Sequence, residues 1–376
     1  MANTLTTLTP TLFSAAKEVG AEPFGVVGAI NTSFDDKGVA KGDNVTVDVA
    51  PTRAASDFTP ANVPSTGGDS TAAKIDVQIT KSRKVDWHLT GEQIRTLENG
   101  GISQDWVQQL VAQGMRTLRN EAEIDAALAV KVGASRATGT AGTTPFASTL
   151  DNLVDVRKIL MDNGSPMADL QFVGDTAAGA AMRKLGVIQN HYQAGSDEER
   201  RSGILQRQFG FMPRESAGIA LHTKGSGSGY LVNNAGPYAI GTTAITVDTG
   251  TGTILAGDII TFAGDTNKYV VASALASNVV TIAAPGLRQT LADNVALTVG
   301  NNYTANLAFE RNSVVGVMRP PLMPANPTIT QQLISDSMGM TYLMLDIAQY
   351  GQRTWELHLA WGFKSINTEF SAIVLG

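Results

Sequence analysis

Apolar residues occupy every second position in three short stretches near the start of the chain, at 45–49, 75–79 and 85–89. Since successive side chains of a strand point to opposite faces of a sheet, this alternation predicts three β-strands. Residues 50–73, between the first two stretches, are rich in Pro, Thr, Ser, Gly and Ala and are predicted to form a loop. A loop of more than 20 residues is unusual inside a compact domain. We therefore interpret this segment as a projecting hairpin that finds its contacts on a neighbouring molecule.

The period of an α-helix is clearest in residues 103–133. Ser103 suits the N-cap and Asp105 suits the first turn. Apolar residues recur at steps of three, four and seven, at Val107, Val111, Met115, Leu118, Ala122 and Ala129. About 30 residues at roughly 1.5 Å each would form a rod of about 45 Å, long enough to be the spine of a domain. The charged residues of this helix are expected to form a solvated face with local ion pairs, with a subunit interface as the alternative: Arg116, Arg119, Glu121, Glu123 and Asp125.

The rest of the chain divides into a mixed part and two β-rich parts. Helices are predicted near Leu150–Asp162 and Thr176–Leu185, with a short strand at Asp169–Val173 between them. Residues 241–300 contain short β-rich pieces separated by turn signals about every 10 residues, which is the pattern of a small inserted sandwich or barrel. Residues 303–376 are dominated by predicted strands.

The composition indicates a globular protein with unusually little charge. The 376 residues are enough for two or three cores, and 43% of them are apolar. Charged residues make up only 16%, which hints that copies of the chain cover much of one another's surface. The net charge of −6 and the scattered Lys and Arg residues argue against a protein that grips nucleic acid by its phosphates.

Cysteine content and apolar run lengths exclude further classes. The chain has no cysteine, so disulfides, thiolate metal sites and thiol nucleophiles are excluded. Residues Met1–Thr11 lack the basic flank and apolar run of a signal peptide. No stretch approaches the roughly 18 uninterrupted apolar residues that a membrane helix needs. We therefore expect a protein of cytoplasmic origin without a membrane span.

Motifs that suggest chemistry are few, and each has a plainer explanation. The four histidines, His88, His191, His222 and His358, show no metal-ligand spacing. Asp248-Thr249-Gly250 is similar to the aspartic-protease motif, but a turn between two strands explains it. Gly68-Asp69-Ser70 lacks the strand–turn–helix setting of a hydrolase nucleophile, and Gly225–Gly229 lacks the Gly-Lys-Ser/Thr ending of a phosphate loop and is interpreted as flexible. We predict no catalytic, cofactor-binding or metal-binding residue.

The densest basic cluster consists of Lys81, Arg83 and Lys84. Lys81 and Arg83 interrupt a predicted strand on the side that is otherwise apolar. This position suits an inter-subunit contact or a strand edge protected by charge, with a nucleic-acid patch as the weaker alternative. Together with Trp87, these residues are the candidate inter-subunit contact site.

Several segments spread over nearly the whole chain resemble one protein family. They are Met1–Thr6, Ile79–Val85 with Trp87–Glu92, Gln113–Glu121, Ile159–Pro166, Asn306–Ser313 with Arg319–Leu322, and Ala360–Lys364 with Phe370. In this order they resemble the coat protein family of short-tailed Salmonella-type phages, whose members share the capsid fold of tailed phages, also called the Johnson fold. These are packing and interface segments and include no catalytic signature.

The resemblance implies an α+β fold with an N-terminal arm, an extended β-hairpin loop, a peripheral domain with a long spine helix, an axial domain and a small inserted all-β domain. The expected boundaries are 1–44 for the arm, 45–89 for the extended loop, 90–165 for the peripheral domain with its spine helix at 103–133, 166–240 for the first part of the axial domain, 241–300 for the inserted domain, 301–325 for the second part of the axial domain, and 326–376 for the C-terminal strands of the peripheral domain.

The same resemblance implies a structural major capsid protein, not an enzyme, that assembles with itself into hexamers and pentamers of an icosahedral shell enclosing double-stranded DNA. It implies a scaffolding protein and a portal as partners, a decoration protein as an optional one, and no cofactor or membrane. The DNA would be enclosed without sequence-specific binding, and the location would be the virion capsid, assembled in the host cytoplasm.

Two alternatives stay open from the sequence. A phage tail or capsid-decoration protein would explain the inserted β module but not the long helix. A secreted hydrolase or adhesin should carry a signal peptide or a second catalytic signature.

Overall fold

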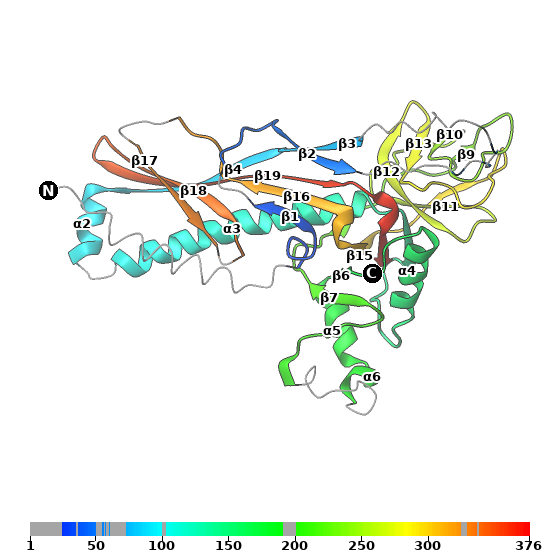
Figure 1. The fold of residues 1–376 in the computed structure, drawn as a ribbon, viewed down its shortest axis with the longest axis horizontal. Helices are drawn as coiled ribbons and strands as arrows, with labels where there is room; N and C mark the ends of the chain where they lie inside the picture. Colours follow the sequence, from blue (N-terminus) through cyan, green and yellow to red (C-terminus); the bar gives the residue numbers. More distant parts are fainter. Residues whose placement is uncertain are drawn as a thin grey trace.

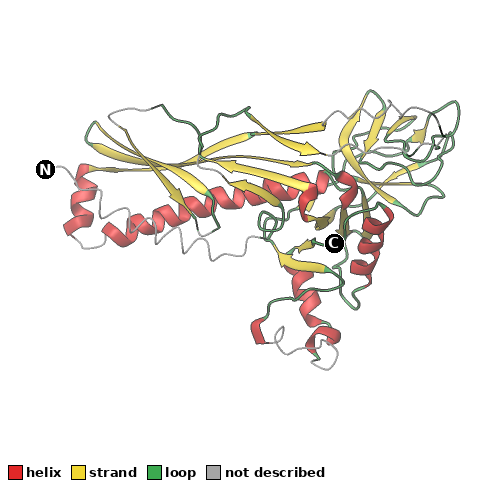
Figure 2. Ribbon diagram, viewed as in Figure 1, coloured by secondary structure: helices red, strands yellow, loops and turns green. Residues whose placement is uncertain are grey.

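The computed structural model describes residues 25–34, 37–49, 55, 57, 60, 73–99, 103–190, 201–324, 329–336 and 338–376. The fold is mixed α/β, with many strands and few helices among these residues (Figure 2). The molecule is elongated, and its longest helix runs along the long axis (Figure 1). Most of the predicted arm and most of the predicted loop at 50–73 lie outside the described residues.

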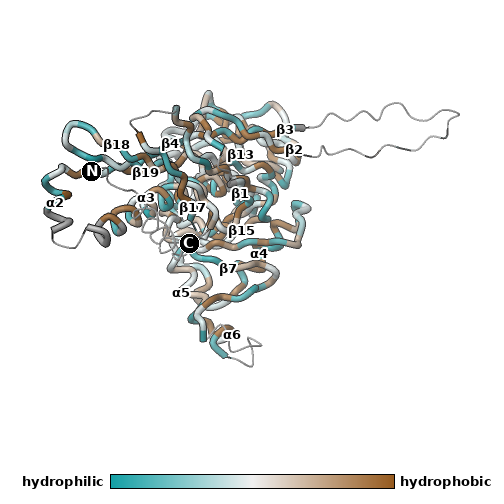
Figure 3. The backbone as a smooth tube through the Cα atoms, turned by 60° about the vertical axis from the view of Figure 1, so that its left-hand side comes forward, coloured by the Kyte–Doolittle hydropathy of each residue, from teal (hydrophilic) through white to brown (hydrophobic). Residues whose placement is uncertain are grey.

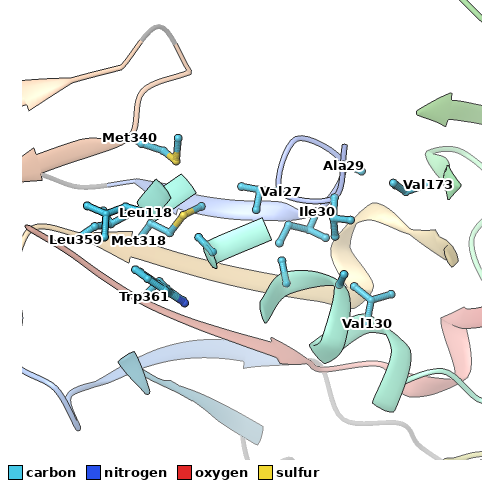
Figure 4. Packing of buried hydrophobic residues seen from close by; sticks show 14 of the residues in the cluster. Val27, Ala29, Ile30, Leu118, Val130, Val173, Met318, Met340, Leu359 and Trp361 are labelled. Atoms are coloured by element: carbon cyan, nitrogen blue, oxygen red, sulfur yellow. The ribbon is translucent and has the colours of Figure 1, made fainter. Parts of the chain in front are cut away.

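The long helix predicted at 103–133 is confirmed as α3 (Ser103–Val132). Its apolar stripe is buried at Val107, Val111, Met115, Leu118 and Ala122. The stripe packs against a sheet whose inward side chains include Trp355, Leu357, Leu359 and Trp361. Figure 4 shows Leu118 of the helix beside Met318, Leu359 and Trp361 of the strands. This shared core fixes the helix along the sheet.

That sheet joins strands from distant parts of the chain. It has six strands within the described residues, in the order β1 (Asn31–Phe34), β16 (Val314–Arg319), β19 (Gln352–Ser365), β18 (Thr341–Gln349) and β17 (Ile329–Ser335), with β4 (Lys81–Thr90) also paired to β19. The β1–β16 pair is parallel, and the other pairs are antiparallel. A helix that the sequence did not predict, α2 (Gly91–Asn99), follows β4. The sheet therefore depends on pairing between residues near both ends of the chain.

The first two predicted strands form a separate two-stranded sheet, β2 (Asn44–Val49) and β3 (Ala73–Gln78). Figure 3 shows these two strands side by side at the margin of the molecule. At the end where β3 leads into β4, the sheet packs on a small core that includes Val77, Ile79 and Val317. Gly362 of β19 allows this close approach, since a Cβ there would lie 2.0 Å from the carbonyl oxygen of Gln78.

A second sheet is formed by strands that lie between Arg136 and Leu375 in the sequence. Its first part contains β7 (Phe211–Glu215), β6 (Leu170–Gly174), β15 (Tyr303–Glu310), β20 (Ser371–Leu375) and β5 (Arg136–Gly139), with β8 (Leu221–His222) also paired to β15. The helices beside it are α4 (Asp151–Asp162), α5 (Thr176–Lys184) and the short α6 (Gly186–Gln189), and two 3₁₀ turns lie at Arg311–Ser313 and Thr368–Phe370. The helices predicted near 150–162 and 176–185 and the strand near 169–173 are thus confirmed.

The predicted β module closes into a small barrel. Its strands are β9 (Leu231–Val232), β10 (Ala244–Asp248), β11 (Ile259–Phe262), β12 (Lys268–Ala276), β13 (Val279–Ile282) and β14 (Leu297–Val299). They pair in the ring order β9-β10-β13-β12-β11-β14. Two hydrogen bonds close the ring: Val232 N donates to Val295 O, and Leu297 N donates to Tyr230 O, both over 2.9 Å. The barrel core includes Tyr230 and Val232, which precede residue 241, the expected start of the module.

The barrel is continuous with the second sheet, because β12 pairs with β5. The chain enters the barrel after β8 and leaves it before β15, and these two strands pair with each other through His222 and Tyr303. The segment Gly225–Gly229, interpreted from sequence as flexible, is instead hydrogen-bonded at the barrel rim. Gly227 N donates to Thr253 O over 2.8 Å, and a Cβ at Gly225 would lie 2.1 Å from that oxygen. Gly225 and Gly227 therefore let this segment pack closely against the backbone at Thr253.

Candidate functional site

Two of the predicted contact residues, Lys81 and Arg83, lie on β4 and reach carboxylates of α3 in the same chain. Lys81 Nζ lies 2.8 Å from Asp125 Oδ2, and Arg83 Nε lies 2.9 Å from Glu121 Oε1. The Lys81 and Arg83 side chains are 43% and 58% exposed, so water screens both pairs. These cations therefore hold β4 over the long helix and still present charge at the surface.

Lys84 pairs across the strands with Glu356 of β19. Its Nζ lies 2.6 Å from Glu356 Oε1, and His358 Nε2 lies 2.9 Å from Glu356 Oε2. The hydrogen bond to Glu356 raises the pKa of the Lys84 ammonium above its ordinary value, against the opposing effect of burial. Burial alone would raise the pKa of the Glu356 carboxyl, but the hydrogen bonds from Lys84 and His358 outweigh it and lower that pKa. The group is an internal ion cluster on the sheet.

Trp87, the fourth predicted contact residue, is half-buried between the sheet and the long helix. It lies opposite Trp355 in the β4–β19 register. A Cβ at Gly114 would lie 3.4 Å from its ring, so the helix approaches closely here. The indole nitrogen of Trp87 has no hydrogen-bond partner among the described residues. The four candidate residues thus share one strand, and the contact of this strand with a second copy stays a prediction.

The charged face predicted on α3 is not uniformly solvated, and this prediction is wrong for Glu123 and Arg119. Glu123 is buried and accepts hydrogen bonds from Val26 N at 2.6 Å, Val27 N at 3.0 Å and Ser216 Oγ at 2.6 Å. The reason is that the Gly25–Ile30 turn lies across the helix and presents its backbone donors to this carboxylate. Glu123 therefore joins the root of the arm to the long helix.

Arg119 and Asp125 are also engaged internally. Arg119 is 1% exposed; its Nη2 donates to Met338 Sδ over 3.3 Å, and its Nη1 lies 3.9 Å from Asp336 Oδ2. Asp125 accepts a hydrogen bond from the indole nitrogen of Trp361 at 2.7 Å. Periodicity could not find these contacts, since the partners are more than 200 positions away in sequence.

A cavity of about 450 Å³ lies beside Glu123, lined among others by Arg116, Asn120, Thr176 and Glu215. Its lining contains no histidine or cysteine within the described part of the chain. Both oxygens of Glu123 are already used by backbone and hydroxyl donors. The other carboxylate of the lining, Glu215, accepts hydrogen bonds from Arg183 Nη1 at 2.6 Å and Nη2 at 2.7 Å, so both carboxylates beside the cavity are already engaged.

The motifs that suggested chemistry have plainer roles where the structure describes them. Asp248-Thr249-Gly250 is a turn at the end of β10, in which Thr249 has a φ of 55° and Gly250 packs under the Tyr230 ring. His88 is exposed on β4, whereas His191 and Gly68–Ser70 lie outside the described residues. No group of three or more metal-binding side chains occurs in the part of the chain that the structure describes. Nor is any described helix long and apolar enough to cross a membrane.

The surface carries one feature that the sequence analysis missed. Tyr350 is 98% exposed at the tip of the β18–β19 hairpin, with a φ of 51°, next to Gly351 with a φ of 72°. A two-residue turn with positive φ values between alternating strands is a recognisable hairpin signal. The tyrosine gains nothing from its own chain, so it is available to another molecule. Other large apolar residues exposed on the described surface include Ile124, Leu128, Leu221, Leu322 and Leu333.

Comparison with known proteins finds similarity at the level of structure. No protein-family model matches the chain, and no curated protein sequence matches it. The capsid structure of the Cyanophage P-SCSP1u is 10% identical and covers 92% of this chain and 86% of its own, with a TM-score of 0.48. The mature capsid of bacteriophage PhiM1 is 11% identical, with 92% and 85% covered and a TM-score of 0.44. A structure from Mycobacterium phage Che8 is 12% identical, with 89% and 85% covered and a TM-score of 0.45. These neighbours extend over most of the chain.

Proposed function

We propose that this chain is the major capsid protein of a tailed double-stranded DNA bacteriophage and forms the hexamers and pentamers of an icosahedral shell. The observation that carries the proposal is the two-stranded sheet β2–β3, whose strands pair only with each other among the described residues. A two-stranded hairpin is marginally stable in water without further packing. Its own chain buries the sheet at Val77 and Ile79, and contacts with a second copy would supply packing for the rest of the hairpin.

The rest of the architecture supports the same function. An elongated helix-and-sheet body, a separate mixed unit and a small barrel at one end give one subunit several distinct surfaces (Figure 1). With 16% charged residues and a fully exposed tyrosine at a hairpin tip, these surfaces suit contacts between copies. The net charge of −6 suits an inner wall that encloses DNA without holding it tightly.

The finer assignment follows the sequence resemblance. In this proposal the chain is a relative of the coat proteins of short-tailed Salmonella-type phages, with an arm at 1–44, an extended loop at 45–89, a peripheral domain at 90–165 and 326–376, an axial domain at 166–240 and 301–325, and an inserted domain at 241–300. A scaffolding protein and a portal would be its assembly partners, with a decoration protein as an optional one. Assembly would occur in the host cytoplasm.

The β4 cations have a defined place in this proposal. Lys81, Arg83 and Lys84 bind carboxylates of their own chain but remain 43–58% exposed. A neighbouring carboxylate could therefore approach them without displacing the internal partner. Trp87 would then fix the strand that presents them.

The test is removal of the loop between β2 and β3. Residues 50–72 are replaced by Asn-Gly, which joins the register partners Val49 and Ala73 as a tight turn. Negative-stain microscopy is carried out on the intact and shortened chains, each with and without a co-expressed scaffold. We expect the shortened chain to stay soluble and folded but to form no shells. Normal shells from the shortened chain would contradict the proposed role of the hairpin.

A further inference from the structure

Three parts of the molecule meet at one buried histidine. Lys131, in the last turn of α3, places its Nζ 3.2 Å from His222 Nδ1 on β8. On the other side of the ring, His222 Nε2 lies 2.8 Å from Oδ1 of Asp258, in the turn before β11 of the barrel. The Asp258 side chain is 0% exposed and that of His222 is 8% exposed. A single chain of hydrogen bonds thus links the long helix, the second sheet and the barrel.

The partners of Asp258 fix the direction of these hydrogen bonds. Its carboxylate also accepts from Leu255 N at 2.7 Å and from Gly225 N at 3.1 Å, so it acts only as an acceptor. His222 Nε2 must therefore carry a hydrogen and donate it to Asp258. In the neutral ring Nδ1 is then an acceptor, and the Lys131 ammonium donates to it. Lys131 therefore donates to His222, and His222 donates to Asp258.

The remaining neighbours leave little freedom at this junction. The ring of Tyr303, on β15, lies 5.1 Å from the His222 ring, and its hydroxyl donates to Gly257 O over 2.5 Å. Burial raises the pKa of the Tyr303 phenol, which therefore stays neutral. A Cβ at Gly257 would lie 3.2 Å from Lys131 Cε, so the lysine stem passes close to the backbone of the turn before β11. Among the described residues, Lys131, Asp258 and Tyr303 are the titratable groups that contact His222.

We propose that protonation of His222 releases Lys131, so that this junction is a pH-operated clamp between the long helix and the barrel. An imidazolium carries a hydrogen on both nitrogens, so its Nδ1 would face the ammonium as a second donor and a second positive charge. The contact of the imidazolium with the Asp258 carboxylate becomes stronger at the same time. The lysine is therefore the group that leaves.

Two further observations fit a clamp of this kind. Burial lowers the pKa of the Lys131 ammonium, so keeping this group charged inside the junction costs free energy. The barrel has a second connection to the body through the pairing of β12 with β5, where Tyr269 lies opposite Arg136. Release of Lys131 would loosen the helix end against the barrel without detaching the barrel. This inference does not rest on the proposed function.

The clamp is tested on the full unassembled chain by hydrogen–deuterium exchange at pH 8 and pH 5.5, corrected for intrinsic exchange rates. We expect residues 129–134 to exchange on the order of tenfold faster at the lower pH, whereas residues 255–259 should keep their protection because the contact of Asp258 with His222 persists. His222→Gln and Lys131→Met should each abolish this difference between the two pH values. His88→Gln is the matched control, because His88 is exposed on a strand of the other sheet and should leave the difference unchanged.

Each result decides the proposal. No pH step in the wild-type chain, or a step that persists in Lys131→Met, would overturn it. Should His222→Gln fail to fold, the Lys131→Met variant still provides the test. NMR of ¹³C-labelled histidine gives a second measurement: the His222 ring must gain its proton over the same pH range as the exchange step, and a ring that stays neutral throughout that range refutes the clamp.

Discussion

Replacing Glu123 by alanine should detach the root of the N-terminal arm from the long helix. The carboxylate accepts hydrogen bonds from Val26 N, Val27 N and Ser216 Oγ, all in a buried setting. Without it, two backbone N–H groups next to the buried Val26 and Val27 side chains lose their acceptor. Each unsatisfied buried donor costs about 1–3 kcal/mol, so we expect the two donors to cost about 2–6 kcal/mol locally.

The assay is hydrogen–deuterium exchange of the unassembled chain at pH 7, followed in a peptide that covers Gly25–Ile30. A local cost of about 3 kcal/mol corresponds to exchange on the order of 100-fold faster in this turn. Glu123→Gln keeps the side-chain volume and one acceptor oxygen, so its effect should fall between those of the wild type and Glu123→Ala. Urea denaturation of the same samples shows whether the loss is local or global.

Glu121→Ala is the matched control, since Glu121 lies on the same helix but pairs with the largely exposed Arg83. Exposed ion pairs contribute about 1 kcal/mol or less, so this variant should leave the Gly25–Ile30 turn protected. Equal exchange of that turn in the Glu121 and Glu123 variants would refute the reasoning, because it would show that the three hydrogen bonds to Glu123 do not hold the turn.

Three further predictions follow from other contacts. The folded-state pKa of Glu356 is lowered below its ordinary value of 4.5, so its contribution to the free energy of unfolding is present above about pH 4.5 and is lost as the pH falls through the folded-state pKa. Glu356→Gln should therefore reduce the loss of stability that urea titrations measure at acid pH. The reduction should be less than about 1 kcal/mol because its partner Lys84 is half-exposed. Tyr350→Ala should change stability by less than about 0.5 kcal/mol yet lower the yield of shells counted by microscopy, and an unchanged yield would count against a contact at this tip. Gly362→Ala should cost about 3 kcal/mol in urea unfolding, because its Cβ would lie 2.0 Å from a carbonyl oxygen of β3, whereas Gly236→Ala, with no atom within 4 Å, should be neutral.

Local sequence patterns predicted those helices and strands in which buried residues recur at a regular spacing. The period of α3, the alternation of β4 and the short strands of the barrel were predicted in this way and are present in the structure, whereas β19 is buried on both faces from Leu357 to Gly362. The helix α2 was missed because it is only nine residues long, follows a strand directly and has only two large apolar residues, Ile94 and Leu97. Patterns of this kind identify an element only when it buries enough residues to show its period.

Contacts between distant segments were not predictable in this way. A glutamate on a helix has the same appearance in sequence whether it faces water or, like Glu123, a backbone turn 97 positions away. Glycines that permit close packing, such as Gly225, look like flexible linkers until the strand they approach is known. The same holds for Lys131, His222 and Asp258, which come from three segments that meet only in the folded chain.

The pairing of His222 with Tyr303 has a consequence for the barrel between them. The chain leaves the second sheet and re-enters it at paired residues of neighbouring strands. The barrel between them is therefore an inserted unit whose two ends lie side by side. Insertions and exchanges are best tolerated where both junctions lie close together on a stable scaffold. Replacing that unit would leave both junctions in place and would remove only its pairing with β5 from the second sheet.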